Sequence, residues 1–337
     1  MIKRLLFLIL SADLLLSAVS FAQPGSPRED RRPKIIVDND LCGDPDGLFA
    51  LAHQVLCESV NIRGIVGAHL NARPGMGGSR NQAEVSVEKA NGLLEVMGLA
   101  GKFTVVPGAD RPMERPDIPV ESEGARLIVE EARQCSPDRP LFVLMGGPLT
   151  DISSALLMAP EVASNIIVLW IGGQEYPFGH PQPLGGISEV EYNLNLCIPA
   201  ARYLFNDSTV RLWQIPRDAY RSCLYSFVSH DLHVKPLGAM GAFLDQNLSQ
   251  WRSFGSGETY VLGDSPLVLL SSLLTFFEPD TASSDFVETA APYITEDGEY
   301  DFSRAGRSIR VYTRLDTSFM FKDMEDRFKL HAGGGDR

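Results

Sequence analysis

Four aspartates stand close together near the start of the chain, in the segment DNDLCGDPDG at residues 38–47. They are Asp38, Asp40, Asp44 and Asp46. Carboxylates at this spacing repel one another at neutral pH, so they need shared protons or a bound cation. Because the donors are oxygens and no Cys–His pattern lies nearby, the preferred ion is a hard one such as calcium or magnesium. The segment therefore predicts a metal site rather than a solvated acidic turn.

Two other kinds of acidic loop can be compared with the same segment. An EF-hand loop that begins at Asp38 would place Phe49 at its last position, where a bidentate glutamate is required. That alternative fails. A phosphohydrolase with Asp38 as the nucleophile and Asp40 as the acid stays open, although it gives the second pair of aspartates no role.

The elements around these acids place them at the edge of a sheet. Residues 35–37 are Ile-Ile-Val, which predicts a short buried strand, and the apolar pattern over residues 48–56 predicts a helix. The acids therefore stand on a strand-to-helix turn. Open α/β sheets bind their ligands at the carboxyl ends of strands, so this turn is a favourable place for a site.

Strands and helices continue to alternate along the rest of the chain. Further strands are predicted at residues 60–68, 103–106, 140–145, 166–171, 210–214 and 308–313. Helices are predicted at residues 81–99 and 152–157 and after residue 317. This order predicts an α/β fold with a mostly parallel central sheet and helices on both faces. We expect one domain over residues 33–325 and a flexible tail at 326–337.

The N-terminus and the overall charge limit the compartment and the partners. Lys3 and Arg4 precede an apolar run that ends in a small-residue pattern at Ala22, which predicts a signal peptide over residues 1–22. We therefore expect an exported protein, either periplasmic or secreted. The five cysteines show no metal or disulfide spacing. The formal net charge of -13 argues against nucleic acid or an anionic membrane as a partner.

The acidic segment and three later segments together resemble the nucleoside hydrolase family. DNDLCGDPD followed by an Ala-Leu-Ala helix resembles the family's N-terminal signature, with one extra residue. Gly-Gly-Pro-Leu-Thr at 146–150, Glu-Tyr-Asn at 191–193 and Gly-Asp-Ser-Pro at 263–266 resemble later segments of the family in the same order. The resemblance covers about residues 33–320. It implies a Rossmann-like core and hydrolysis of the N-glycosidic bond of ribonucleosides through an oxocarbenium-like transition state.

The same resemblance implies a calcium ion as the cofactor. Its implied ligands are Asp40, Asp46, Asp264 and the main-chain carbonyl oxygen of Gly146. Asp40 would also accept the proton of the attacking water, and Asp38 would support the loop without touching the ion. The extra residue in the segment leaves open whether Asp44 or Asp46 is the bidentate ligand.

Substrate contacts are implied in the same way. The implied ribose-binding residues are Asp44, Asn71, Glu191 and Asn193. Candidates to contact the base lie near strand ends or in the long loop before residue 187, and they are Tyr176, His180, Trp213, Tyr220 and Arg221. We expect a small-molecule substrate and a homo-oligomer, either a dimer or a tetramer.

Two positions depart from the family pattern. Gly263 replaces the histidine that protonates the leaving base in some members, and Gly185 stands where the family often has an asparagine. Two alternatives therefore stay open. One is a metal-dependent protein that binds nucleosides or ribose without turnover, and the other is a hydrolase of a different ribosyl glycoside.

Overall fold

The computed structural model describes residues 32–70, 81–178, 189–253, 255–273, 283–304 and 306–334. The expected signal peptide, Asn71, His180 and Gly185 lie outside these residues. No helix in the described ranges is both long enough and apolar enough to span a membrane.

A sheet of eight strands forms the centre of the described chain, in the order β3-β2-β1-β4-β5-β6-β12-β9. Neighbouring strands from β3 to β12 pair in parallel, and β9 pairs antiparallel with β12. The eight strands are β1 (Lys34–Asn39), β2 (Asn61–Gly67), β3 (Val105–Pro107), β4 (Leu141–Met145), β5 (Ile166–Ile171), β6 (Arg211–Ile215), β9 (Asp285–Ala290) and β12 (Ser308–Arg314). Two small antiparallel sheets join β7 (Leu224–Ser226) to β8 (Thr259–Val261), and β10 (Tyr293–Ile294) to β11 (Tyr300–Asp301).

Helices connect these strands and cover the sheet. They are α1 (Asp46–Gln54), α2 (Gln82–Val96), α3 (Glu123–Ala132), α4 (Thr150–Met158), α5 (Tyr192–Leu196), α6 (Ile198–Arg202), α7 (Arg217–Tyr220), α8 (Phe227–His233), α9 (Gly238–Arg252), α10 (Pro266–Ser271) and α11 (Thr317–Ala332). A 3-10 helix at Pro160–Asn165 and a π-helical turn at Tyr203–Asp207 complete the set.

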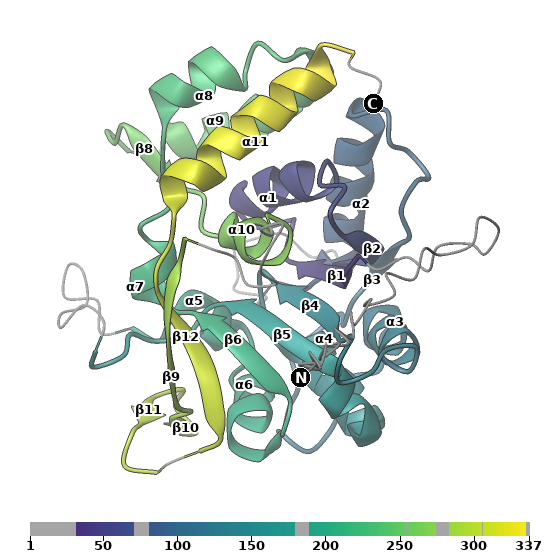
Figure 1. Cartoon of the computed structure of the whole chain (residues 1–337), viewed down its shortest axis with the longest axis vertical. Helices are drawn as coiled ribbons and strands as arrows, with labels where there is room; N and C mark the ends of the chain where they lie inside the picture. The colour runs from purple at the N-terminus through teal and green to yellow at the C-terminus, as the bar shows by residue number, and fades with distance from the viewer. Residues whose placement is uncertain are drawn as a thin grey trace, which may run out of the picture. The chain divides into compact units, whose positions relative to one another are not determined.

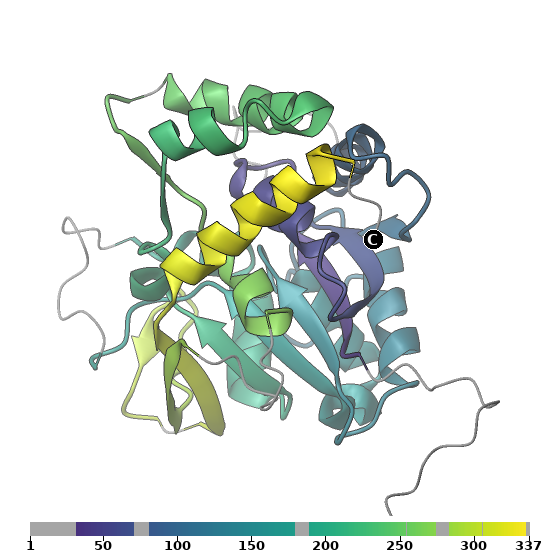
Figure 2. The same cartoon turned by 45° about the horizontal axis from the view of Figure 1, so that its top comes forward.

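Both faces of the sheet are buried, as the strand sequences require. In β1, Ile35 and Val37 belong to one core and Ile36 to the other, because successive side chains of a strand point to opposite faces. The first core includes side chains of α1, α2, α9, α10 and α11, and the second includes side chains of α3, α4 and α6. Figures 1 and 2 show α1, α10 and α11 together over one face of the sheet. The continuous apolar sequence of β5 is typical of a parallel strand covered on both faces.

The predicted fold class and the order of the elements are confirmed. Strand β5 has the predicted bounds, and the other predicted strands differ from the structure by a few residues at their ends. Helix α11 continues to Ala332, so the first part of the segment expected as a tail is helical. Met320, Met324 and Phe328 are buried at intervals of four residues, which fixes this helix against the core. All five cysteines are free.

The strand order places a ligand site next to β1. From β1 the sheet continues through β2 in one direction and through β4 in the other, so the connections leave the carboxyl ends of β1 and β4 on opposite sides. Such a topological switch point opens a crevice at the carboxyl edge of the sheet. The loops after β1 and β4 contain Asp40 and Gly146, respectively.

Candidate active site

The acids after β1 meet Asp264 from the far end of the chain. An Oδ2 atom of Asp46 accepts a hydrogen bond of 3.1 Å from the main-chain N–H of Asp264, although 218 positions separate the two residues. Oδ2 of Asp264 accepts a second bond of 2.7 Å from Nδ2 of Asn39, the last residue of β1. The structure therefore brings Asp264 and the acidic segment to one place at the carboxyl edge of the sheet.

Gly146 and Gly147 let the loop after β4 lie directly against these acids. A Cβ atom at position 146 would lie 2.1 Å from Nδ2 of Asn39 and 2.8 Å from Oδ2 of Asp264. At position 147 it would lie 3.1 Å from Cγ of Asp40. The main-chain N–H of Gly146 also donates to the carbonyl oxygen of Asp38 at 2.9 Å. Only glycine fits at position 146, so the main chain of this loop reaches the cluster without a side chain between them.

The acids have pKa values well away from those of exposed aspartates. Burial, together with the nearby charges of Asp44 and Glu191, raises the pKa of Asp264 to about 8, although the hydrogen bond from Asn39 lowers it. Burial and the charges of Asp264 and Asp44 also raise the pKa values of Asp40 and Asp46. Within the described ranges, none of these side chains forms an ion pair with a lysine or arginine. The cluster is therefore a concentration of acidic groups with no lysine or arginine of the described chain paired to them.

The chemistry of the donors fits a hard divalent cation. Every side-chain donor of the cluster is an oxygen, which calcium and magnesium prefer. Both carboxylate oxygens of Asp38 and the Oδ1 atom of Asn39 are buried and have no hydrogen-bond partner. Buried oxygens without partners are costly unless a proton or a cation compensates them. Asp38, Asp40, Asp46 and Asp264 together are thus suited to hold or surround a divalent ion.

Glu191 is the second feature of the site. It caps α5, and its carboxylate accepts bonds from two main-chain groups of that helix. In total it accepts four hydrogen bonds, from the N–H groups of Gly173 (2.7 Å), Leu194 (2.9 Å) and Asn193 (3.2 Å) and from the hydroxyl of Tyr220 (2.8 Å). Burial raises its pKa, whereas these four donors lower it and hold the carboxylate in one orientation. Its charge also acts on Asp40 and Asp264, so it faces the same site.

Tyr220 and Asn193 link Glu191 to its surroundings. Nδ2 of Asn193 donates to the carbonyl oxygen of Ile171 at 2.9 Å, which fixes this side chain to the end of β5. A Cβ atom at position 263 would lie 3.3 Å from Cδ2 of Tyr220 and 3.2 Å from Oδ2 of Asp46. Tyr220 therefore contacts Glu191 through its hydroxyl, and its ring lies beside Gly263, close to Asp46.

Two of the other residues predicted to contact the base are structural. Trp213 lies in the middle of β6, where its ring packs against Phe142 at a centroid distance of 5.6 Å and lies under the guanidinium of Arg310 at 4.1 Å. A mid-strand side chain points to a face of the sheet, so this residue does not reach the carboxyl edge. Tyr176 is buried and donates its hydroxyl to Oε1 of Gln214 at 2.6 Å. Arg221 caps the C-terminus of α7, next to Tyr220.

Sequence analysis does not identify two residues that contribute to the site. Asn39 donates a hydrogen bond to Asp264. Its position between Asp38 and Asp40 was the feature of the sequence that could have indicated a role in the site. Arg217, the first residue of α7, forms a bidentate ion pair with Glu175 just after β5. No sequence spacing connects Arg217 with Glu175, because their contact depends on the parallel pairing of β5 with β6.

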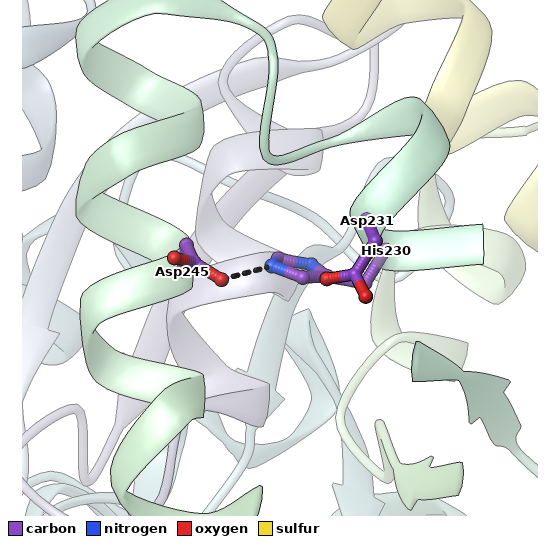
Figure 3. A group of neighbouring side chains, drawn as sticks. All are labelled: His230, Asp231 and Asp245. Carbon is purple, nitrogen blue, oxygen red and sulfur yellow. Dashed lines mark hydrogen bonds and ion pairs between the residues drawn. The ribbon is translucent and has the colours of Figure 1, made fainter. Parts of the chain in front are cut away.

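A second acidic group lies between α8 and α9. Figure 3 shows the side chains of His230, Asp231 and Asp245. Each offers a ligand atom, and these atoms all lie within 4.8 Å of one another. Among the described residues, Asp40, Asp46 and Asp264 do not form so close a set. However, Asp245 binds Nε2 of His230 at 3.0 Å and Nζ of Lys235 at 3.2 Å, and Asp231 binds Arg252 at 2.9 Å. Protein cations already balance this group, so it is an ion-pair network.

The described chain has the same α/β fold as several nucleoside hydrolases of known structure. The inosine-guanosine nucleoside hydrolase (IG-NH) superposes with a TM-score of 0.63 at 16% sequence identity, over 88% of this chain and 99% of that chain. An inosine-uridine preferring nucleoside hydrolase from Bacillus anthracis gives 0.62 at 14% identity, over 88% of this chain and 99% of the other. A nucleoside hydrolase-related protein from Saccharophagus degradans, associated with carbohydrate metabolism, gives 0.57 at 15% identity, over 89% and 72%. No family model and no curated protein matches the sequence.

Proposed function

We propose that this protein hydrolyses the N-glycosidic bond of ribonucleosides with the help of a bound calcium ion. The observation that carries the proposal is the contact of Asp46 with Asp264. This contact lies beside Gly146, and the charge of Glu191 acts on Asp264. The shared fold with two nucleoside hydrolases supports the choice of reaction.

The cation would be held by oxygen ligands from three loops. We assign Asp40, Asp46, Asp264 and the carbonyl oxygen of Gly146 to it. When bound, calcium would lower the pKa of a water molecule and attract the hydroxyl oxygens of the sugar. The reaction needs both effects, the activation of a water molecule and the binding of the sugar, next to the acidic cluster.

The protein groups would act on the sugar and on the attacking water. As the bond between C1′ and the base nitrogen breaks, its electron pair leaves with the base and positive charge develops on the ribose. The carboxylates of Glu191, which is buried, and Asp44, which is half-buried, would stabilise that charge in a sugar bound beside the acidic cluster. Asp40 accepts the proton of the water that attacks C1′.

Glu191 would bind a ribose hydroxyl at the position that a tyrosine now takes. Two oxygens of a carboxylate offer about four acceptor sites, and the structure fills them with Gly173, Leu194, Asn193 and Tyr220. Three of these donors are main-chain groups of the capped helix and its neighbouring loop. The hydroxyl of Tyr220 is the donor that a ribose hydroxyl would replace.

The test is the release of ribose from a panel of purine and pyrimidine nucleosides. We expect release by the wild-type protein with calcium, loss after treatment with a chelator, and recovery when calcium is added back. Asp264→Asn should not recover in the same way. Release that continues after both the chelator and the substitution would eliminate the proposal.

Binding without turnover is the second candidate. It is favoured by Gly263, which offers no imidazole to protonate the leaving base. Calorimetry that shows nucleoside or ribose binding without ribose release would favour this candidate. The phosphohydrolase alternative lacks support because its nucleophile, Asp38, is fully buried.

A further inference from the structure

Arg217 contacts residues near both ends of the segment that connects β5 to Glu191. Its Nε and Nη2 atoms donate to the two carboxylate oxygens of Glu175 at 2.6 and 2.7 Å. Nη2 also donates to Oε1 of Gln174 at 3.2 Å, and Nη1 donates to the carbonyl oxygen of Glu189 at 3.0 Å. One guanidinium group therefore fixes residues 174–175 relative to residue 189.

The contacts of Arg217 continue to Glu191 through the main chain. The N–H of Arg217 donates to the carbonyl oxygen of Gly173 at 3.1 Å, and the N–H of Gly173 donates to Glu191 at 2.7 Å. Glu191 is also two residues from Glu189, whose carbonyl oxygen Arg217 binds. Tyr220, at the other end of α7, donates to Glu191 directly. Residues of α7 therefore contact Glu191 directly through Tyr220 and indirectly through Gly173 and Glu189.

The form of the contact requires an arginine. A guanidinium is planar and presents parallel donors to a carboxylate, whereas an ammonium group is a point charge that cannot make the same paired bonds. The side chain of Arg217 is 7% exposed and that of Glu175 is 14% exposed. A buried ion pair adds little net stability, since the bonds between its members offset the loss of hydration. Its main effect is to fix geometry.

We propose that Arg217 is a positioning residue that holds Glu191 in the orientation needed to bind the ribose. This inference rests on the proposed function, because it assigns Arg217 to the sugar contact of that reaction. Displacement of a binding group by about 1 Å can lower a rate about a hundredfold. Loss of the Arg217 contacts should therefore lower activity without removing any group that touches the substrate.

The test compares Arg217→Lys and Arg217→Met with a matched control, Arg211→Lys. Arg211 is the exposed first residue of β6, at the end of that strand away from Arg217. It donates a hydrogen bond to the carbonyl oxygen of Ser164. We expect both Arg217 variants to lower kcat/KM for ribose release about a hundredfold. Lysine should not rescue the loss, because it cannot form the paired bonds. Arg211→Lys should stay within twofold of the wild type.

A double substitution separates positioning from a general loss of structure. If Arg217 acts through Glu191, Arg217→Met combined with Glu191→Gln should be no slower than Glu191→Gln alone. Fully additive losses would overturn the inference. So would an Arg217→Lys variant whose kcat/KM stays within twofold of the wild type.

Hydrogen exchange tests the inference independently of activity. In the wild type, the amides of residues 193–196 should exchange slowly, and Arg217→Met should speed their exchange at least tenfold while leaving β1 unchanged. Equal exchange in the two proteins would contradict the positioning role. Faster exchange in a protein that releases no ribose from any nucleoside would contradict the proposed function but not the contact itself.

Discussion

The acidic group after β1 and the acidic group between α8 and α9 contain similar residues but have different partners. At the second group, His230, Lys235 and Arg252 lie within ion-pair distance of the aspartates. At the first group, Asp40 and Asp264 lie close to other acids, to Asn39 and to two glycines, and no lysine or arginine of the described chain is paired with them. We therefore predict a cation at the first group, although the ligand atoms of the second group lie closer together. The balance of charge around the atoms is the better criterion.

The two groups also differ in their place in the fold. The first lies at the carboxyl ends of parallel strands, where loops from distant parts of the chain meet. The second lies between two consecutive helices away from the sheet, as Figures 1 and 3 show. We therefore expect substitutions in the first group to affect activity and cation binding, and those in the second to affect only local stability.

The largest expected effect is the loss of activity in Asp40→Asn. This change keeps the shape of the side chain but removes the proton acceptor, and such general-base assistance is worth roughly a hundred- to ten-thousandfold in rate. Asp245→Asn is the matched control and should stay within twofold of the wild type. Steady-state measurement of ribose release checks both. Equal losses of activity in Asp40→Asn and Asp245→Asn would contradict the assignment of the reaction to the first acidic group.

The next effect is stabilisation of the fold by calcium. At a calcium concentration about one hundred times the dissociation constant, binding to the native state adds about 2.7 kcal/mol to the free energy of unfolding. We expect this gain in the wild type and in Asp231→Asn but not in Asp264→Asn. Thermal unfolding with and without calcium measures it. A gain that persists in Asp264→Asn would place the ion elsewhere.

The dependence of stability on pH should follow from the raised pKa values. Folding raises the pKa of Asp264 to about 8 and also raises those of Asp40 and Asp46, so the native state binds protons more tightly than the unfolded state. Without calcium, the free energy of unfolding should therefore fall as the pH rises from about 4 to about 8. Calcium should flatten this slope, because a cation favours the ionised carboxylates. A metal-free protein that becomes more stable over this range would contradict the prediction.

The smallest effect concerns the ion pair of Asp231 with Arg252. Their side chains are 39% and 41% exposed, and an exposed pair contributes about 0 to 1 kcal/mol. Asp231→Asn should therefore change the free energy of unfolding by less than about 1 kcal/mol. Urea unfolding measures this change. A larger loss would show that the second group has a role beyond a surface ion pair.

The sequence predicted the fold well because local patterns determine it. Apolar runs such as Ile35–Val37 and Ile166–Ile171 are strands covered on both faces, and they alternate with amphipathic helices. The acidic segment was also recognisable, since its members are neighbours in the chain. Asp264 could be assigned only through the family resemblance, because no local pattern connects it to β1.

The sequence could not predict contacts that depend on tertiary structure. Arg217 meets Glu175 and Glu189 only because β5 and β6 pair and the chain returns to α5 beside them. The surroundings of Trp213 also depend on tertiary structure. An aromatic residue near a strand end looks accessible in the sequence, whereas its face of the sheet is covered by Phe142 and Arg310.

Anomalous scattering from crystals grown with calcium is the most direct test of the central claim. We predict one strong peak in contact with the carboxylates of Asp40, Asp46 and Asp264, and no peak between His230 and Asp245. A peak at the second group alone, or none at the first with calcium at a saturating concentration, would contradict the claim.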